Sequence, residues 1–383
     1  MHFNHSPDQE MLRDTVRRFV QERVVPNARE WDREHRFPRD VVSELGEMGL
    51  MGISVPENYG GSGFGSIETA IVVEEVAKGD GSLALTVASH NGLCTGHISM
   101  FANEGQKDRY LGALSSGQKL GAWGLSEPGS GSDAVAMETN AVRDGDAWVL
   151  NGSKIFITQG TVADVFVVMA RTDRDKGSRG VTAFILERGM AGFTQNPILH
   201  KLGMRASDTA ELHFENVRVP DANRIGEEGE GFIQTLQILD KGRITIGALA
   251  LGLGRGAFDH ARRYATERKQ FGKPLSDFQA IQFKLADMAT ELDAADLLVR
   301  RAAALCDEGQ RFGREASMCK LFASEAAMRA TDQAIQIHGG YGYTAEFPVE
   351  RYYRDAKLCT IGEGTSEIQR MVIARDVLKE LRD

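Results

Sequence analysis

The chain has 383 residues, 42% of them hydrophobic, and a formal net charge of −9. This length is enough for two or three domains with sizeable cores, and the acidic balance disfavours nucleic acid as a partner, because phosphates require a basic face. No apolar run reaches the ~18 residues of a membrane span, and the N-terminus lacks the apolar segment of a signal peptide. We therefore expect a protein without a membrane span, in the cytoplasm or, after processing, in the mitochondrial matrix.

The four cysteines and nine histidines give no sign of a disulfide or a metal site. The cysteines are far apart and form no Cys-x-x-Cys pair, so buried thiols in a reducing compartment are expected. Among the histidines, His2 and His5 come nearest to a ligand spacing, but they lie at a terminus. No bound metal is therefore expected.

Residues 1–117 are predicted to form an N-terminal all-α domain. Ser6-Pro7-Asp8-Gln9 has the pattern of a capping box with proline at the first helical position. Apolar residues then recur at helical spacing, and Pro26 is expected to end that helix. Residues 41–48 and 67–76 are predicted to form further helices.

Residues 118–229 are predicted to form a small middle domain of the β-barrel or β-sandwich type. Asn151-Gly152 lies between two β-rich runs and predicts the turn of a hairpin. Further short β-rich runs at 165–170, 181–186 and 212–219 are separated by polar turns.

Residues 230–383 are predicted to form a C-terminal helical domain. Apolar residues recur with a period of 3.6 in residues 281–295, and the runs 297–304, 317–337 and 368–381 continue this pattern. Four long helices suggest a four-helix bundle. The expected fold class is α+β multidomain, in the order α, β, α.

A single carboxylate between two glycines lies near the C-terminus, in the run Gly362-Glu363-Gly364-Thr365-Ser366-Glu367-Ile368-Gln369. The glycines remove steric cover, so that a substrate can approach Glu363 closely. The hydroxyl and amide side chains that follow are suited to a polar cofactor. This pattern is that of a general base beside a cofactor, although a Gly-Glu-Gly run alone is also typical of a solvated loop.

Five motifs occur in a fixed order along the chain, and the run around Glu363 is the last of them. The other four are Trp123-Gly124-Leu125-Ser126-Glu127-Pro128-Gly129-Ser130-Gly131-Ser132-Asp133, Asn151-Gly152-Ser153-Lys154-Ile155-Phe156-Ile157-Thr158, Glu267-Arg268-Lys269-Gln270-Phe271-Gly272 and Gln336-Ile337-His338-Gly339-Gly340-Tyr341-Gly342. Together they closely resemble the acyl-CoA dehydrogenase family of flavoenzymes, over essentially the whole chain. The resemblance implies a homo-oligomer, a tetramer rather than a dimer, with one FAD per subunit held between the β domain, the C-terminal bundle and a neighbouring subunit.

The reaction that the resemblance implies is α,β-dehydrogenation of an acyl-CoA thioester to the trans-2-enoyl-CoA, as in fatty acid β-oxidation, with electrons passed to electron-transfer flavoprotein. Glu363 matches the family's base, and FAD N5 accepts the hydride. In the family, the backbone N–H of this glutamate and a ribityl hydroxyl of the flavin form an oxyanion hole for the thioester oxygen. We expect burial against flavin and acyl chain to raise the pKa of Glu363.

The resemblance also implies FAD contacts along the chain. Phe156 stands where the family usually has tryptophan, which keeps an aromatic face but loses an indole N–H, and Glu367 stands where glutamine is frequent. The FAD contacts implied in the β domain and after the base are Trp123, Leu125, Ser126, Ser132, Phe156, Ile157, Thr158, Thr365 and Glu367. Further FAD contacts, some of them across a subunit interface, are implied at Arg268, Gln270, Phe271, Gln279, Gln336, Gly339 and Gly340.

Substrate contacts are implied at Ser132, at Asp240 and Arg243, and at the two glycines beside the base, Gly362 and Gly364. Asp240 and Arg243 match positions that bind CoA or edge the active site, and Ser132 is a candidate contact to the pantetheine. The alternative for Asp240 and Arg243 is a surface pair at i,i+3 spacing.

Three glycines in Gly252-Leu253-Gly254-Arg255-Gly256 resemble a dinucleotide-binding loop. No strand precedes them, so close packing of a helix is expected instead.

Single positions within the motifs bear on the substrate. Gly242 stands where the isovaleryl branch of the family carries its base, so Glu363 is expected to be the only base. Gly362 replaces a common tyrosine, which predicts room for a short branched or cyclic acyl chain. Ala84 stands in place of the arginine that binds a carboxylate in the glutaryl branch, so glutaryl-CoA is not expected. An acyl-CoA oxidase and a non-catalytic flavin-binding protein are the alternative functions.

Overall fold

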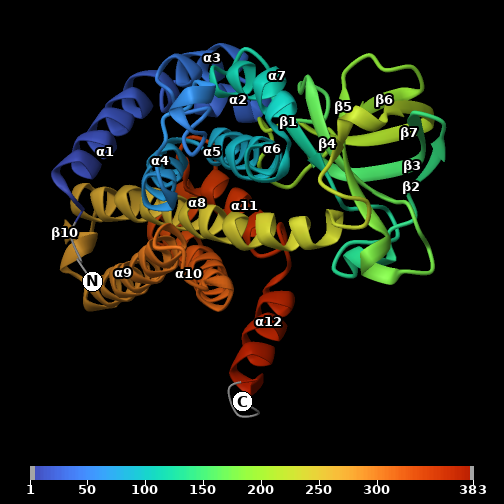
Figure 1. Ribbon diagram of the computed structural model, residues 1–383. Helices are drawn as coiled ribbons and strands as arrows, with labels where there is room; N and C mark the ends of the chain where they lie inside the picture. The colour runs from blue at the N-terminus through green and yellow to red at the C-terminus, as the bar shows by residue number, and fades with distance from the viewer. Residues whose placement is uncertain (1–4, 380–383) are drawn as a thin grey trace.

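The computed structural model describes residues 5–379, and these form three parts in the order α, β, α (Figure 1). The N-terminal helices and the β domain lie side by side along one flank of the long helix α8 (Gly231–Glu267), and the other C-terminal helices lie along the opposite flank. The expected α+β fold class is confirmed. His2 and the end of the helix predicted at 368–381 lie outside the described residues.

The N-terminal part begins with the predicted capping box. Ser6 Oγ accepts a hydrogen bond from the Gln9 N–H at 3.2 Å, and Gln9 Oε1 accepts one from the Ser6 N–H at 3.0 Å. The helix continues as a π-helical stretch to Val24 and ends before Pro26, as predicted. The helices of this part are α1 (Pro7–Phe19), α2 (Ala28–Glu34), α3 (Arg39–Glu47), α4 (Ser66–Gly79), α5 (Gly81–Ser89), α6 (Gly96–Phe101) and α7 (Glu104–Ser115).

The β domain contains one sheet with the strand order β6-β7-β3-β2-β4-β5-β8, and β1 pairs in parallel with β4. A buried apolar cluster joins β1, β4 and β5 to α6, α7 and the start of α8. This cluster fixes the β domain against the helices. The strands are β1 (Gly121–Gly124), β2 (Asn140–Asp144), β3 (Ala147–Thr158), β4 (Val165–Arg171), β5 (Val181–Glu187), β6 (Phe193–Pro197), β7 (Thr209–Pro220) and β8 (Arg224–Ile225).

The hairpin predicted at Asn151-Gly152 is wrong. Strand β3 runs straight through these residues, and its pairing with β7 shifts register between Leu150 and Gly152, which marks a β-bulge. Gly152 has φ 140°, and a Cβ there would lie 2.6 Å from Thr139 Oγ1. The extra residue of this bulge lies on β7, and Gly152 opposite it takes up the unusual φ within β3. The Asn-Gly signal does not distinguish this arrangement from a turn. The hairpin turn lies instead at Gly145, between β2 and β3.

The C-terminal part consists of α8, α9 (Gln279–Asp307), α10 (Gly313–His338), α11 (Val349–Cys359) and α12 (Ser366–Lys379), with a short hairpin of β9 (Lys269–Gln270) and β10 (Lys273–Pro274). The runs predicted at 281–295 and 297–304 belong to the single helix α9. Helices α8, α9 and α10 pack on one another, and α12 lies against α10, where Arg370 pairs with Glu325 and Asp376 with Arg311. The C-terminal end of α12 projects away from the other helices (Figure 1).

The glycines of α8 allow close helix packing, as expected. A Cβ at Gly252 would lie 2.3 Å from the Glu74 carbonyl oxygen of α4. At Gly254 it would lie 2.6 Å from a Leu292 methyl of α9. The backbones of these helices therefore approach at positions where no side chain fits.

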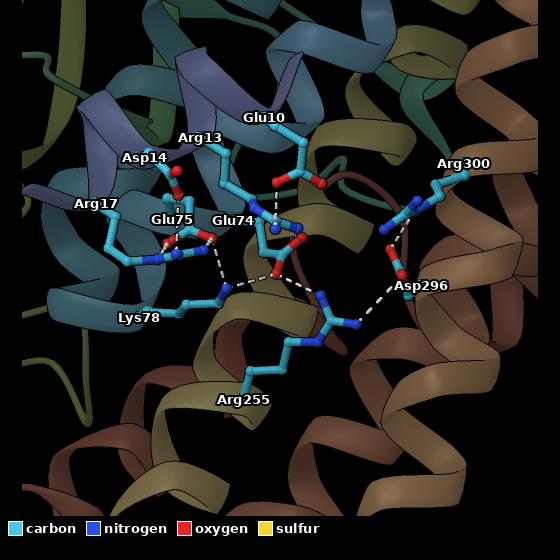
Figure 2. A network of polar contacts seen from close by, with 10 residues as sticks. All are labelled: Glu10, Arg13, Asp14, Arg17, Glu74, Glu75, Lys78, Arg255, Asp296 and Arg300. Carbon is cyan, nitrogen blue, oxygen red and sulfur yellow. Dashed lines mark hydrogen bonds and ion pairs between the residues drawn. The ribbon is translucent and has the colours of Figure 1, made fainter. Parts of the chain in front are cut away.

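A network of charged side chains ties α4 to the helices around it (Figure 2). Arg255 of α8 places Nη1 2.6 Å from Glu74 of α4 and Nη2 3.2 Å from Asp296 of α9. Lys78 lies 2.9 Å from Glu74 and 2.7 Å from Glu75. Burial alone would raise the pKa of Glu74, but Lys78 and Arg255 outweigh it and lower that pKa to about 2. Removing one partner would leave a buried charge uncompensated, which makes this joint between the N- and C-terminal helices costly to break.

Candidate active site

Glu363 lies in the tight connection between α11 and α12. Its backbone has φ 53°, a left-handed conformation that is uncommon outside glycine, and Gly364 follows with φ 93°. Lys320 Nζ donates to the Gly364 carbonyl oxygen at 2.6 Å, and Gln369 Nε2 donates to the same oxygen at 2.9 Å. Strained backbone that neighbouring side chains hold in place is frequent at functional sites.

The carboxylate of Glu363 reaches the surface of α8 at Gly242. A Cβ on Gly242 would lie 1.9 Å from Glu363 Oε2, so only glycine leaves this oxygen its place. Oε2 is buried and has no hydrogen-bond partner among the described residues. A buried carboxylate oxygen without a partner is rare and calls for a functional explanation.

The electrostatic surroundings favour a carboxylate that exchanges protons near neutral pH. Burial raises the pKa of Glu363 to about 7, and the charges of Lys320 and Arg243 partly offset this rise. A general base works best when its pKa lies near the operating pH.

Asp240 and Arg243 form a pair on α8, on either side of Gly242 in the sequence. Arg243 Nη1 lies 2.5 Å from Asp240 Oδ1 and 3.4 Å from Ser317 Oγ of α10. Arg243 is only 6% exposed, so it is no surface residue of a solvated pair. Burial raises the pKa of Asp240, although Arg243 opposes this effect.

The loop after β1 is held by a buried ion pair that the sequence reading missed. Lys154 of β3 places Nζ 2.7 Å from Glu127 Oε1 and 3.1 Å from the Leu125 carbonyl oxygen. The Glu127 carboxylate also accepts hydrogen bonds from the backbone N–H groups of Glu138 and Thr139. Glu127 and Lys154 each lie in one of the five family motifs, where their immediate neighbours are small or apolar. That isolated charge is the sequence signal that could have indicated a buried ion pair.

A hydrogen bond to a buried histidine orients the Trp123 side chain. Its indole Nε1 donates to His97 Nδ1 at 3.1 Å, and His97 Nε2 lies 3.0 Å from Gln234 Oε1. Because Nδ1 accepts, the ring proton of His97 is on Nε2. Burial lowers the pKa of His97 to about 4, so the imidazole is neutral.

The structure brings two of the implied FAD segments together. The Ile155 N–H donates to the Ser126 carbonyl oxygen at 2.9 Å, which joins β3 to the loop after β1. At the next residue β3 itself bulges, and Phe156 has φ 61° and is 67% exposed. Ile157 is buried, whereas Ser132 is exposed. An exposed aromatic ring beside a loop of glycine and serine fits a large planar group such as a flavin.

A second set of implied FAD contacts lies at the other end of α8. Arg268 stands over the Tyr341 ring at 5.7 Å, which joins the end of α8 to the turn after α10. Figure 1 places β10 at one end of α8 and the β domain at the other, and 37 helical residues span about 55 Å. One chain therefore does not bring both sets together. The set at this end is exposed and comprises Arg268, Gln270, Phe271, Gln279, Gln336, Gly339 and Gly340.

Thr365 and Glu367 stand at the start of α12. Thr365 Oγ1 accepts a hydrogen bond from the Ile368 N–H at 3.3 Å. A surface hollow between α10 and α12 is lined by both residues together with Ile361, Lys357 and Glu325. They are thus close to the Glu363 connection and open to a ligand.

Gly362 is not required by close packing. A Cβ there would meet only ordinary contacts with Leu358, at 3.6 Å or more. Ala84 lies fully buried in α5.

Residues 5–379 contain neither a candidate metal site nor a helix that could cross a membrane. No group of three or more histidine, cysteine, aspartate or glutamate side chains could hold a metal ion there. No helix of this part is long and apolar enough to cross a membrane.

Comparison with known proteins assigns the family. The models of the acyl-CoA dehydrogenase N-terminal, middle and C-terminal domains match residues 6–118, 122–217 and 229–378. Members of this family are FAD-dependent oxidoreductases.

Individual relatives match over nearly their whole length. The short-chain specific acyl-CoA dehydrogenase of Clostridium acetobutylicum is 46% identical, covering 99% of this chain and 100% of its own. The acryloyl-CoA reductase (NADH) of Anaerotignum propionicum is also 46% identical, covering 99% and 96%. The structure of butyryl-CoA dehydrogenase from Megasphaera elsdenii superimposes with a TM-score of 0.97 at 43% identity, covering 99% and 100%. This chain therefore belongs to the acyl-CoA dehydrogenase family.

Proposed function

We propose that the protein dehydrogenates short acyl-CoA thioesters between Cα and Cβ, with Glu363 as the base that removes the α-proton. The observation that carries this proposal is the Glu363 carboxylate. Its Oε2 is buried, lacks a partner among the described residues and lies against Gly242, and burial raises its pKa to about 7. A carboxylate in this state can take a proton from a weak carbon acid near neutral pH.

The backbone at Glu363 can stabilise the charge that develops on the thioester oxygen. The Gly362 N–H donates to the Leu358 carbonyl oxygen, but the Glu363 N–H has no acceptor among residues 5–379. Left-handed φ values at Glu363 and Gly364 turn this backbone out of the helix. A preorganised N–H aimed at the developing oxyanion lowers the barrier for enolate formation.

FAD bound to this chain would supply the acceptor for the hydride that leaves Cβ. The residues proposed to hold it are the Trp123 to Ser132 segment, Phe156, Ile157, Thr158, Thr365 and Glu367. Residues at the far end of α8, such as Arg268 and Gln270, are proposed to reach the FAD of another subunit, because they lie about 55 Å from the β domain. We therefore propose a homo-oligomer. From the family we further propose a tetramer rather than a dimer, and electron-transfer flavoprotein as the electron acceptor.

A short acyl chain, straight or branched, is the proposed substrate. The space at Gly362 would accept substituents near the reacting carbons, and the relatives named as short-chain specific and as butyryl-CoA dehydrogenase support a short chain. Ala84, an uncharged residue at the position aligned with the glutaryl branch, argues against glutaryl-CoA.

A second candidate is the reverse reaction, reduction of a short enoyl-CoA. The 46% identity to an acryloyl-CoA reductase favours it. The same Glu363 would then deliver the proton to Cα, since proton transfer at one site runs in both directions.

The test is an anaerobic titration of the FAD-loaded protein with acyl-CoA thioesters from butyryl- to palmitoyl-CoA, together with isobutyryl-, 2-methylbutyryl-, isovaleryl- and glutaryl-CoA. We expect short and branched substrates to bleach the visible flavin band and glutaryl-CoA to leave it unchanged. If butyryl-CoA is turned over but all three branched thioesters are inert, the proposal that the protein accepts branched acyl chains is contradicted. No bleaching by any thioester would contradict the dehydrogenase proposal.

Two further measurements separate the alternatives. Reduced enzyme that is reoxidised by acryloyl- or crotonyl-CoA much faster than the forward reaction proceeds would favour the reductase. Rapid reoxidation by air would favour an acyl-CoA oxidase, and slow reoxidation is expected here.

A further inference from the structure

Lys320 of α10 lies beneath the connection that carries Glu363. Its side chain is fully buried. Nζ donates to the Gly364 carbonyl oxygen at 2.6 Å, directly after the base, and Gln369 Nε2 binds the same oxygen. No carboxylate of residues 5–379 forms an ion pair with it. A buried ammonium with only a carbonyl as close partner is costly to maintain.

The charged and titratable groups around Lys320 come from four directions. Arg243 faces it from α8, where Asp240 already pairs with that arginine. Glu363 faces it from the connection, Glu367 from α12, and the Cys359 thiol from α11. Burial raises the pKa of Cys359 to about 12, so this thiol is neutral. The carboxylate of Glu363, whose Oε2 is buried, is therefore the negative charge that Lys320 is expected to stabilise most.

We propose that Lys320 is a positioning residue for the base: it fixes the Gly362–Thr365 connection through the Gly364 carbonyl, and its positive charge favours the ionised form of Glu363. This inference rests on the proposed function for the role of Glu363. The geometry that supports it is the shared carbonyl, because the left-handed backbone at Glu363 and Gly364 needs an anchor on the side of α10.

The direction of the electrostatic effect follows from the surroundings of Glu363. Burial raises its pKa, and Lys320 is the larger of the two charges that lower it, ahead of Arg243. Removing the charge of Lys320 should therefore raise the pKa of Glu363 further. If the pKa of Glu363 rises by one unit, the ionised fraction of its carboxyl falls about tenfold at a pH well below that pKa. The rate of flavin reduction should fall by the same factor there and recover at high pH.

Three substitutions separate the hydrogen bond to the Gly364 carbonyl from the positive charge of Lys320. Lys320→Met removes both, Lys320→Gln keeps an N–H donor without the charge, and Lys320→Arg keeps both. Ser324→Ala changes another buried polar residue of α10, whose hydroxyl bonds within its own helix, and serves as the control. FAD content and thermal melting establish that each variant is folded, and Lys320→Gln carries the test if Lys320→Met does not fold.

The measurement is an infrared titration of the Glu363 carboxyl in the resting FAD-loaded enzyme, with the signal assigned by its loss in Glu363→Gln. We expect a higher pKa in Lys320→Met and Lys320→Gln, and values near wild type in Lys320→Arg and Ser324→Ala. Unchanged titration in both uncharged variants would overturn the proposal, and so would an equal shift in Ser324→Ala. Because the titration needs no turnover, it stands even if no acyl-CoA reduces the flavin, so the two proposals fail separately.

Discussion

Two connections of this molecule are each held by a buried lysine, but the lysines differ in their partners. Lys154 binds the Leu125 carbonyl oxygen and forms an ion pair with Glu127, in the loop proposed to hold the flavin. Lys320 binds the Gly364 carbonyl oxygen beside the proposed base and has no ion pair with a carboxylate of the described residues. Burial lowers the pKa of both lysines to about 8.

The comparison indicates that a buried lysine bound to a backbone carbonyl can act in two ways, depending on whether a carboxylate pairs with it. Lys154 forms an ion pair with Glu127, a carboxylate of the loop whose backbone it binds, so its charge is neutralised locally and it serves to fix the backbone. Where the charge has no such partner, as at Lys320, we propose that it acts on the Glu363 carboxylate and favours its ionised form. Substitutions at or near each connection can break or sharpen this comparison.

The largest loss of stability is expected for Lys154→Met. It leaves Glu127 buried without its cation, which costs about 3–5 kcal/mol of unfolding free energy, and the loop should lose FAD. Denaturant unfolding and flavin content measure both effects. The double variant Lys154→Met/Glu127→Gln should recover part of the loss, because it removes the unpaired charge. A single variant as stable as wild type would show that the pair does not hold the loop.

Gly242→Ala should cost catalysis rather than stability. A Cβ at 1.9 Å from Glu363 Oε2 must push the carboxylate aside, and a misplacement of this order lowers the rate about 10²-fold. FAD content should stay at the wild-type level. The rate of flavin reduction by butyryl-CoA measures the effect, and an unchanged rate would mean that the base does not work from the place described here.

Gly252→Ala tests stability at a distance from both connections. The added methyl group would meet the Glu74 carbonyl oxygen at 2.3 Å, and such overpacking costs about 1–3 kcal/mol. Gly105→Ala in α7 is the matched control, since its Cβ meets nothing closer than 3.6 Å. Thermal melting should separate the two variants, while the pKa of Glu363 stays the same in both. Equal melting temperatures would contradict the close packing of α8 on α4.

The smallest effect is expected for Gly362→Tyr, which fills the space beside the base. It should lower the kcat/KM ratio of isobutyryl-CoA to butyryl-CoA about tenfold, because one misfitting group in a pocket costs about 1–3 kcal/mol. Gly362→Ala should change this ratio little. An unchanged ratio in the tyrosine variant would remove the structural basis proposed for branched substrates.

The sequence predicted the parts of this molecule that depend on local pattern. The capping box at Ser6 and the helical packing of Gly252 and Gly254 follow from spacing and glycine content, and the structure confirms them. The hairpin prediction at Asn151-Gly152 failed because Gly152 adopts its unusual φ within a strand, opposite a bulge of β7, and not in a turn. The Gly-Glu-Gly pattern likewise predicted Glu363 as a candidate base.

The sequence could not predict the lysines that hold the two connections. Lys154 and Glu127 are 27 residues apart, and Lys320 and Gly364 are 44 apart, so no local period links them. Each lysine also reads as an ordinary surface charge until its burial is known. For the same reason, only the structure shows that Arg268 and the β domain lie at opposite ends of α8.

The most direct test of the account is anaerobic rapid mixing of butyryl-CoA with the wild-type protein and with Glu363→Gln, both loaded with FAD. Glutamine keeps the shape of the side chain but cannot accept the α-proton. We predict fast bleaching of the flavin in the wild type and a rate lower by about 10²- to 10⁴-fold in Glu363→Gln, with FAD content and butyryl-CoA binding retained. Bleaching of Glu363→Gln at the wild-type rate would contradict the account, because another group would then remove the proton.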